Sequence, residues 1–317
     1  MVKFSYRRKL YGAMQNYFSK NIITHLEEIL NHNNVNYENL FEDLQNSFKA
    51  RDIVNCYKYI LENKQDVKLL NYTIRHINKT RYFDILEPLI EFIKKEYNDV
   101  AFLDLKVLAI KTMSNFKNTK CVPVLLHCLN DKNSNYKIRL ASAEALGKIG
   151  DKNAFESLSN VVNDEAENSA YIKESAVVAL GLLGDKRALD VFEGILNTKE
   201  MFLGKFSYLK ERIVEAMAKF DISKDNKALK ILKRSLLDTS SRLRISAIET
   251  LSNSDFDCAY ELIYDRLLYD DDTEVKKNAL IALYNISDRK ILDEVIKGEF
   301  EFELKRTAKE IIDEYEQ

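Results

Sequence analysis

Hydrophobic and small residues recur along the chain in a fixed register. Each copy has an aliphatic residue, a basic residue directly after it, small or aliphatic residues three and four places later, and Leu, Met or a like residue at the seventh place. These places fall on one stripe of a helix with 3.6 residues per turn. The basic residues of successive copies are Lys106, Arg139, Lys173, Lys210, Arg244 and Lys276.

The spacing of the copies, 32 to 37 residues, predicts a repeat made of two helices. Such a period is typical of solenoids, in which each helical pair buries its apolar face only against its neighbours. Two copies end in Gly-Asp, at Gly150 and Gly184; glycine suits the left-handed residue after a helix, and the aspartate can cap the next helix. Second helices are expected at residues 153–162, 187–196, 227–237 and 258–268.

This pattern resembles the HEAT repeat, in the variant named after phycobilisome lyases. The resemblance is carried by the runs from Ile138-Arg139 to Asp151 and from Ile172-Lys173 to Asp185. It implies an all-α fold: an armadillo-type α-solenoid of HEAT-like helical repeats, wound as a right-handed superhelix, with helical caps at both ends. The caps are expected because an open end would expose the apolar face of the last repeat.

The stretch in which the repeat frame can be recognised predicts a division of the chain into three parts. Residues 1–66 are expected to form an N-terminal helical cap and a degenerate repeat. Residues 67–292 are expected to form the HEAT-like array, and residues 293–317 a C-terminal capping helix that covers 302–315.

The composition fits a helical intracellular protein. The chain has 317 residues with two prolines and eight glycines, which leaves little room for β-turns or linkers. A formal net charge of −2 argues against binding of duplex nucleic acid, which usually needs a basic excess. Four cysteines without a C-x-x-C pair predict buried thiols in a reduced, cytoplasmic protein, and no apolar run has the length of a membrane span.

The places of the frame are counted from the basic residue of each copy, which therefore has the zero place. These basic residues are predicted to join neighbouring repeats. The HEAT resemblance implies that each pairs with an acid in a turn, and Asp131, Asp164 and Asp238 stand before three of them. The mixture of Lys and Arg also argues against a site that needs a bidentate guanidinium. A phosphate-binding stripe is the alternative.

Glutamates gather on two neighbouring rows of the same helices, which line the concave side in HEAT proteins. They are Glu144, Glu174, Glu211, Glu215 and Glu249. An ordinary solvated face would explain them. The sharper hypothesis is a groove for a partner that carries positive charge, such as a basic peptide, helix or protein patch.

Two further segments are candidates for contact with a partner. Residues 199–208 lie where the spacing widens, and Met201, Phe202 and Phe206 are unusually apolar for a loop. They either pack back onto the array or touch a partner. Residues 1–20 are basic, without an acid, and carry an apolar stripe. They form either a capping helix or a peripheral contact with an anionic membrane.

No residue pattern predicts a catalytic, cofactor or metal site. The four histidines have no H-x-x-x-H spacing, and none is followed by the glutamate of the iron-binding helical-repeat hydroxylases. The sequence therefore favours a non-catalytic scaffold or adaptor that binds another protein. The alternative is an enzyme or enzyme subunit resembling HEAT-like bilin lyases or helical-repeat DNA glycosylases, although the latter stack bases on tryptophan and this chain has none.

Overall fold

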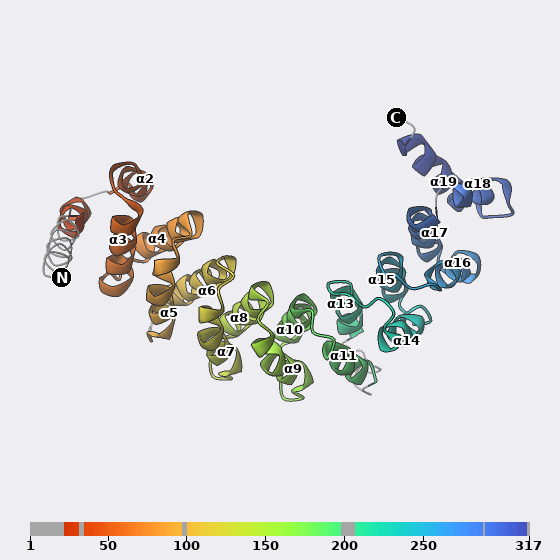
Figure 1. Cartoon of the computed structure of the whole chain (residues 1–317), viewed down its shortest axis with the longest axis horizontal. Coiled ribbons are helices and arrows are strands. Elements are labelled where there is room, and N and C mark those ends of the chain that lie inside the picture. Colours follow the sequence, from red (N-terminus) through yellow and green to blue (C-terminus); the bar gives the residue numbers. More distant parts are fainter. Residues whose placement is uncertain (1–21, 32–34, 97–99, 198–206, 288, 316–317) are drawn as a thin grey trace, which may run out of the picture. The chain divides into compact units, whose positions relative to one another are not determined.

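The chain is helical and divides into two compact units, residues 1–151 (the N-terminal unit) and 152–317 (the C-terminal unit). The computed structural model describes residues 22–31, 35–96, 100–197, 207–287 and 289–315. Within these ranges there is no β-strand, and helices alternate between two layers in each unit (Figure 1). The predicted all-α fold of stacked helical pairs is confirmed.

In the N-terminal unit, successive helices of one layer pack side by side. This first layer consists of α2 (Tyr37–Ser47), α4 (Val67–Thr80), α6 (Val100–Asn115) and α8 (Tyr136–Ile149). The second layer consists of α3 (Ala50–Asn63), α5 (Leu86–Lys94) and α7 (Val122–Asn130), with short 3₁₀ turns η1 (Phe83–Ile85) and η2 (Thr119–Cys121) before α5 and α7. Residues 22–30 form a further helical stretch ahead of α2. The core lies between the layers, where Phe41, Tyr57 and Phe92 are fully enclosed.

The C-terminal unit repeats this plan. Its first layer consists of α10 (Ala170–Leu183), α13 (Ser207–Met217), α15 (Ser241–Ser252) and α17 (Thr273–Ser287). Its second layer consists of η3 (Lys152–Ala154), α9 (Phe155–Asn163), α11 (Ala188–Leu196), α14 (Asn226–Ser235) and α16 (Ala259–Tyr269). The unit closes with α18 (Lys290–Lys297) and α19 (Phe302–Tyr315), so a closing helix lies where the sequence predicts one.

The repeating frame describes the core correctly. The residues at its seventh place, all without exposed surface, are Met113, Leu146, Leu180, Met217, Leu251 and Leu283. Small residues at other places let the helices approach closely. A Cβ atom added at Gly181 of α10 would lie 2.5 Å from the carbonyl oxygen of Ala216 in α13.

The helix ends also reflect the local sequence. Gly150 and Gly184 adopt φ of 77° and 63°, the left-handed conformation expected of glycine after a helix. At the other ends, the side chain of Asn135 accepts a hydrogen bond from the N–H of Lys137, and Ser240 accepts one from Leu243.

Several sequence predictions lie beyond what the structure describes. Residues 1–20 and the apolar residues Met201, Phe202 and Phe206 are outside the described ranges. The three-part division of the chain and the hand of the superhelix stay predictions.

Candidate partner-binding surfaces

In the C-terminal unit, three basic residues at the zero place, Lys210, Arg244 and Lys276, form ion pairs with acidic side chains. Lys210 Nζ lies 2.9 Å from Asp238 Oδ2, and Lys276 Nζ lies 2.5 Å from Glu301 Oε1. In both cases the acid comes after the second-layer helix of the same repeat. Arg244 also pairs with an acid in a turn, as predicted, but the acid is Asp270 and not the preceding Asp238, whose carboxylate binds Lys210.

Arg244 binds a different acid, in the turn after α16. Its Nε lies 2.9 Å from Asp270 Oδ2 and its Nη2 lies 2.7 Å from Asp270 Oδ1, a two-point contact between planar groups. Its Nη1 donates to the backbone carbonyls of Asp238 and Thr239 at 2.9 and 3.3 Å. The guanidinium thus joins the turns on both sides of its repeat, so its function is structural.

The Asp270 carboxylate is buried and charged. Burial opposes its ionisation, but hydrogen bonds from Arg244 and from the backbone N–H of Asp272 outweigh burial, so the pKa of Asp270 lies below its ordinary value. The same balance, with Lys210 as the donor, holds the pKa of Asp238 low.

Arg139 and Lys173 are also buried, with 7% and 5% of their surface exposed. Arg139 Nε donates to the Leu129 carbonyl at 3.1 Å, at the end of α7. Burial removes both cations from the surface that a ligand could reach. The structural interpretation is therefore confirmed for Lys210, Arg244 and Lys276, while the contacts of Lys106, Arg139 and Lys173 with turn acids stay predictions.

The structure brings some of the predicted glutamates together and separates others. Arg212 bridges two of them: its Nε lies 2.6 Å from Glu174 Oε1 and its Nη1 lies 2.5 Å from Glu215 Oε2. Glu211 Oε1 lies 3.5 Å from the hydroxyl of Ser240, which donates to it. The bridge across α10 and α13 neutralises half of the charge of Glu174 and Glu215.

The other two glutamates are exposed. Glu249 lies on α15 of the C-terminal unit, and Glu144 lies on α8 of the N-terminal unit. The acidic surface of the C-terminal unit therefore depends mainly on Glu211 and Glu249.

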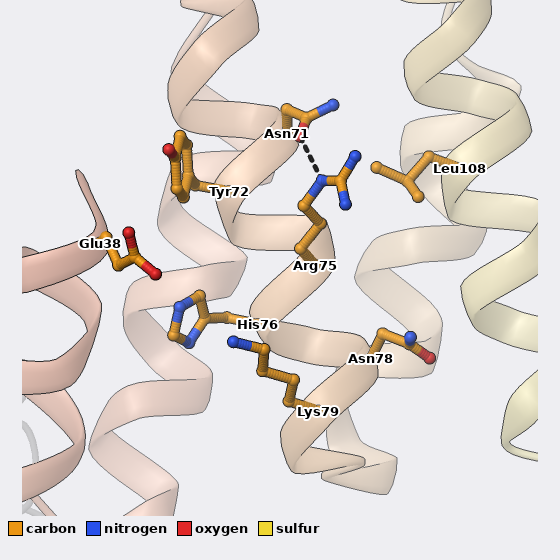
Figure 2. A pocket seen from close by; sticks show the side chains of 8 residues that line it. All are labelled: Glu38, Asn71, Tyr72, Arg75, His76, Asn78, Lys79 and Leu108. Atoms are coloured by element: carbon orange, nitrogen blue, oxygen red, sulfur yellow. Dashed lines mark hydrogen bonds between the residues drawn. The ribbon is translucent and has the colours of Figure 1, made fainter.

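The N-terminal unit contains a cavity of about 550 Å³ on the exposed side of its first layer (Figure 2). It is lined from α2, α4 and α6 by Glu38, Asn71, Tyr72, Arg75, His76, Asn78, Lys79 and Leu108. Because Tyr72, Arg75 and Lys79 are exposed, the cavity is an open groove. We call it the α4 groove, since six of its eight lining residues come from that helix.

Aromatic contacts fix the floor and one wall of the α4 groove. The ring of Tyr72 packs at 5.9 Å against Tyr37, whose hydroxyl donates to Asp66 at 3.1 Å. The imidazole of His76 stacks on Phe41 with 4.7 Å between ring centres. These contacts hold the Tyr72 and His76 rings against their neighbours.

His76 is mainly neutral at pH 7. Burial lowers its pKa, and the charge of Lys79 lowers it further, although Glu38 and Glu42 act in the opposite direction. The neutral ring serves as a hydrogen-bonding group rather than as a fixed charge.

Sequence reasoning missed the α4 groove because the repeat frame fades before residue 99. A usable signal was present in the polar residues Asn71, Arg75, Asn78 and Lys79, which recur at spacings of three and four on α4. That spacing forms one stripe on a helix. A stripe of polar residues opposite a buried stripe marks a face that is open to solvent.

The described residues contain no metal-binding arrangement and no strongly activated thiol. No three His, Cys, Asp or Glu residues in this part of the chain are grouped to hold a metal ion. Burial raises the pKa of Cys56 to about 12 and that of Cys121 to about 11, so both thiols are poor nucleophiles. Cys128 is also buried, as predicted, whereas Cys258 is partly exposed. None of the described helices combines the length and the apolar character that crossing a membrane requires.

Comparison with known proteins identifies the repeats. Residues 86–170 match the family model of HEAT repeats. This part of the chain consists of HEAT repeats. The two helical pairs from α5 to α8 lie within it, and the C-terminal unit continues the same residue frame. No curated protein matches the sequence significantly.

Solved structures with helical repeats resemble the chain at low identity. YibA of Escherichia coli is 15% identical, with a TM-score of 0.46, and the match covers 88% of this chain and 97% of that one. The CpcE–CpcF complex of phycocyanin lyase from Nostoc is 19% identical, with a TM-score of 0.44 and coverage of 88% and 94%. Human deoxyhypusine hydroxylase is 16% identical, with a TM-score of 0.36 and coverage of 83% and 96%. Likeness at this level says nothing about function.

Proposed function

We propose that this HEAT-repeat protein is a non-catalytic scaffold or adaptor that binds another protein through the exposed side of its first-layer helices. The observation that carries the proposal is the α4 groove, which three helices form and which hydrogen-bonding side chains line. Its volume of about 550 Å³ is of the size of pockets for small ligands, about 300–1,000 Å³, and so has room for a few side chains of a partner. Being open, it can hold a segment of a longer chain.

The chemistry of the groove supports binding rather than catalysis. Its lining contains no Ser, Thr or Cys that could serve as a nucleophile. His76 stacks on Phe41, and the side chain next to its Nδ1 is the amide of Gln45, at 3.5 Å. A catalytic histidine is typically oriented by a carboxylate and faces a nucleophile or substrate.

The glutamate row of the C-terminal unit remains a proposed second contact, for a basic part of a partner. Glu211 and Glu249 support it, while Glu174 and Glu215 contribute less because Arg212 is bound between them. We also retain two expectations from the sequence, a cytoplasmic location and the absence of binding to duplex nucleic acid.

Site-specific photo-crosslinking tests the proposed function. A photo-reactive phenylalanine analogue replaces Tyr72 in the groove, and in a control variant it replaces Lys58 on α3, an exposed residue of the second layer. After irradiation in extract of the native cell, we expect discrete crosslinked proteins for the Tyr72 variant and none in common with the Lys58 variant. Identical crosslinks from both positions, or none from Tyr72, Glu211 and Glu249 in turn, would contradict the proposal.

A further inference from the structure

The lining of the α4 groove carries one more positive than negative charge. Arg75 and Lys79 line it, and Glu38 is its single acidic residue. Within the described part of the chain, neither Arg75 nor Lys79 forms an ion pair. Lys111 has the equivalent place on α6: it stands two residues before the buried Met113, as Arg75 stands two residues before the buried Ile77 on α4.

The side chains that α4 contributes to the groove present mainly donors, because contacts within the protein occupy the acceptors of Asn71 and Asn78. Asn71 Oδ1 accepts from Arg75 Nε at 2.7 Å, which leaves the Nδ2 of Asn71 and both terminal nitrogens of Arg75 to donate (Figure 2). Asn78 Oδ1 accepts from Asn115 Nδ2 at 2.8 Å, which leaves the Nδ2 of Asn78. The open hydrogen-bonding capacity of both asparagines is therefore mainly that of donors.

His76 obeys the same rule. Gln45 Nε2 lies 3.5 Å from His76 Nδ1, and an amide nitrogen can only donate. In the tautomer that accepts this hydrogen bond at Nδ1, the ring carries its proton on Nε2. Every polar group on α4 that lines the groove thus has a hydrogen to offer, and the Tyr72 hydroxyl can also accept.

We infer that the α4 groove binds an extended acidic segment of a partner protein, with a carboxylate on Arg75 and Lys79 and main-chain carbonyls on Asn71 and Asn78. This inference rests on the proposed function and names the chemistry of its partner. The two free terminal nitrogens of Arg75 match the two oxygens of a carboxylate, and Tyr72 and Leu108 supply an apolar surface for a neighbouring side chain. The partner segment in the groove would be negatively charged, whereas the partner expected at the glutamate row is positively charged.

A peptide fits the groove better than a nucleic acid does. A nucleic acid would place a phosphate at every nucleotide and needs a continuous track of cations. Glu38 stands in the groove, and exposed Glu42 and Glu144 lie on α2 and α8, the outer helices of the same layer. An acidic peptide carries its negative charge on a few side chains only, so the two cations of the groove, Arg75 and Lys79, are enough to bind it.

The test begins with a selection of random nine-residue peptides, displayed on phage, against the intact protein. We expect enrichment of peptides that contain Asp and Glu. A fluorescent synthetic copy of an enriched peptide is then titrated by anisotropy. Arg75→Gln and Lys79→Gln are each expected to weaken its binding about tenfold, the scale of one charge-assisted contact. Raising the salt from about 0.1 M to about 1 M should weaken it as well, because the screening length falls from about 10 to about 3 Å.

Matched controls separate the groove from general surface charge. Arg51→Gln and Lys58→Gln, both on α3, remove the same charges from exposed sites outside the groove, and we expect no change in affinity. Circular dichroism and a melting curve verify that the groove variants fold. Arg75→Lys keeps the charge but loses the two-point contact, so it should restore only part of the affinity lost in Arg75→Gln.

The outcomes divide clearly. Enriched peptides without acidic residues, or peptides that bind the double variant of Arg75→Gln and Lys79→Gln equally well, overturn this inference but leave the proposed function standing. Binding of oligouridylate that Tyr72→Ala abolishes overturns it in favour of nucleic acid. If no peptide is enriched, the inference fails, and the crosslinks from Tyr72 decide the proposed function separately.

Discussion

Replacing Asp270 by asparagine should destabilise the C-terminal unit strongly, although the change removes only one charge. Asp270 has 1% of its side chain exposed, and Arg244 has 8%. The asparagine side chain would offer a single carbonyl oxygen to a guanidinium that now meets two carboxylate oxygens. The Arg244 charge would stay buried without its main counter-charge.

The expected cost is about 3 kcal/mol at pH 7, at the lower end of the range for breaking a buried pair. The lower end applies because Asp271 Oδ1 also lies 2.9 Å from Arg244 Nη2 and partly compensates. Asp271→Asn is a matched control in the same turn. Since the Asp271 side chain is 92% exposed, its substitution should cost no more than about 1 kcal/mol.

Hydrogen exchange with mass spectrometry is the suitable assay, because repeat arrays unfold in parts and one global free energy describes them poorly. Amides of α15, α16 and α17 should exchange faster in Asp270→Asn, whereas those of α2 to α7 should not change. Equal exchange in the Asp270 and Asp271 variants would refute the argument that burial sets the strength of this contact.

The pH dependence gives an independent check on the same pair. The pKa of Asp270 is lower in the folded protein than its value of about 3.9 in an unfolded chain. Its contribution is therefore fully present above about pH 4 and is lost as the pH falls through the folded pKa. The difference in stability between the natural protein and Asp270→Asn should shrink in acid below about pH 4.

Three further predictions concern the core and the acidic row. Leu180→Ala should cost about 2–5 kcal/mol because it opens a cavity at a residue without exposed surface, and an unchanged melting curve would show that the repeat frame is wrong. Gly181→Ala should destabilise the protein by about 1–3 kcal/mol, because the added Cβ would push α10 away from Ala216 of α13. Gly194→Ala on α11, where no atom lies within 4 Å of the added Cβ, should instead stabilise the protein by about 0.5–1 kcal/mol. Thermal melts of both variants test the difference. Glu211→Lys should weaken binding of a basic peptide most at low salt, as measured by anisotropy, and a gel shift showing tight binding of duplex DNA would contradict the acidic-surface interpretation.

The sequence predicts the core well because one local rule governs it. The apolar stripe of each first-layer helix must meet its neighbours, so the seventh place, from Met113 to Leu283, is buried throughout. Glycine after α8 and α10 likewise has a purely local cause, its positive φ. Where burial and backbone geometry decide, a few adjacent residues carry enough information.

Side-chain partners across repeats are harder to predict. Arg244 lies six residues after Asp238 but 26 residues before Asp270, and it binds the more distant carboxylate. Closeness in sequence favours Asp238, whereas the position of the turn after α16 favours Asp270. Arg212 shows the same difficulty, since its bridge to Glu174 reduces an acidic row whose extent the sequence overstates.

The two arginines Arg244 and Arg75 show why burial has to be known before charge can be interpreted. Arg244 is enclosed, and its donors meet carboxylates and carbonyls of its own chain. Arg75 is exposed, and its one side-chain hydrogen bond to the described residues, from Nε to Asn71, orients the side chain while the terminal nitrogens remain open. A buried, saturated guanidinium can only stabilise the array, because a ligand would have to displace partners that are already in place. An exposed guanidinium with a fixed orientation has lost part of its freedom before the ligand arrives, so binding costs less entropy. Arg244 therefore stabilises the array, whereas Arg75 stays available to a partner.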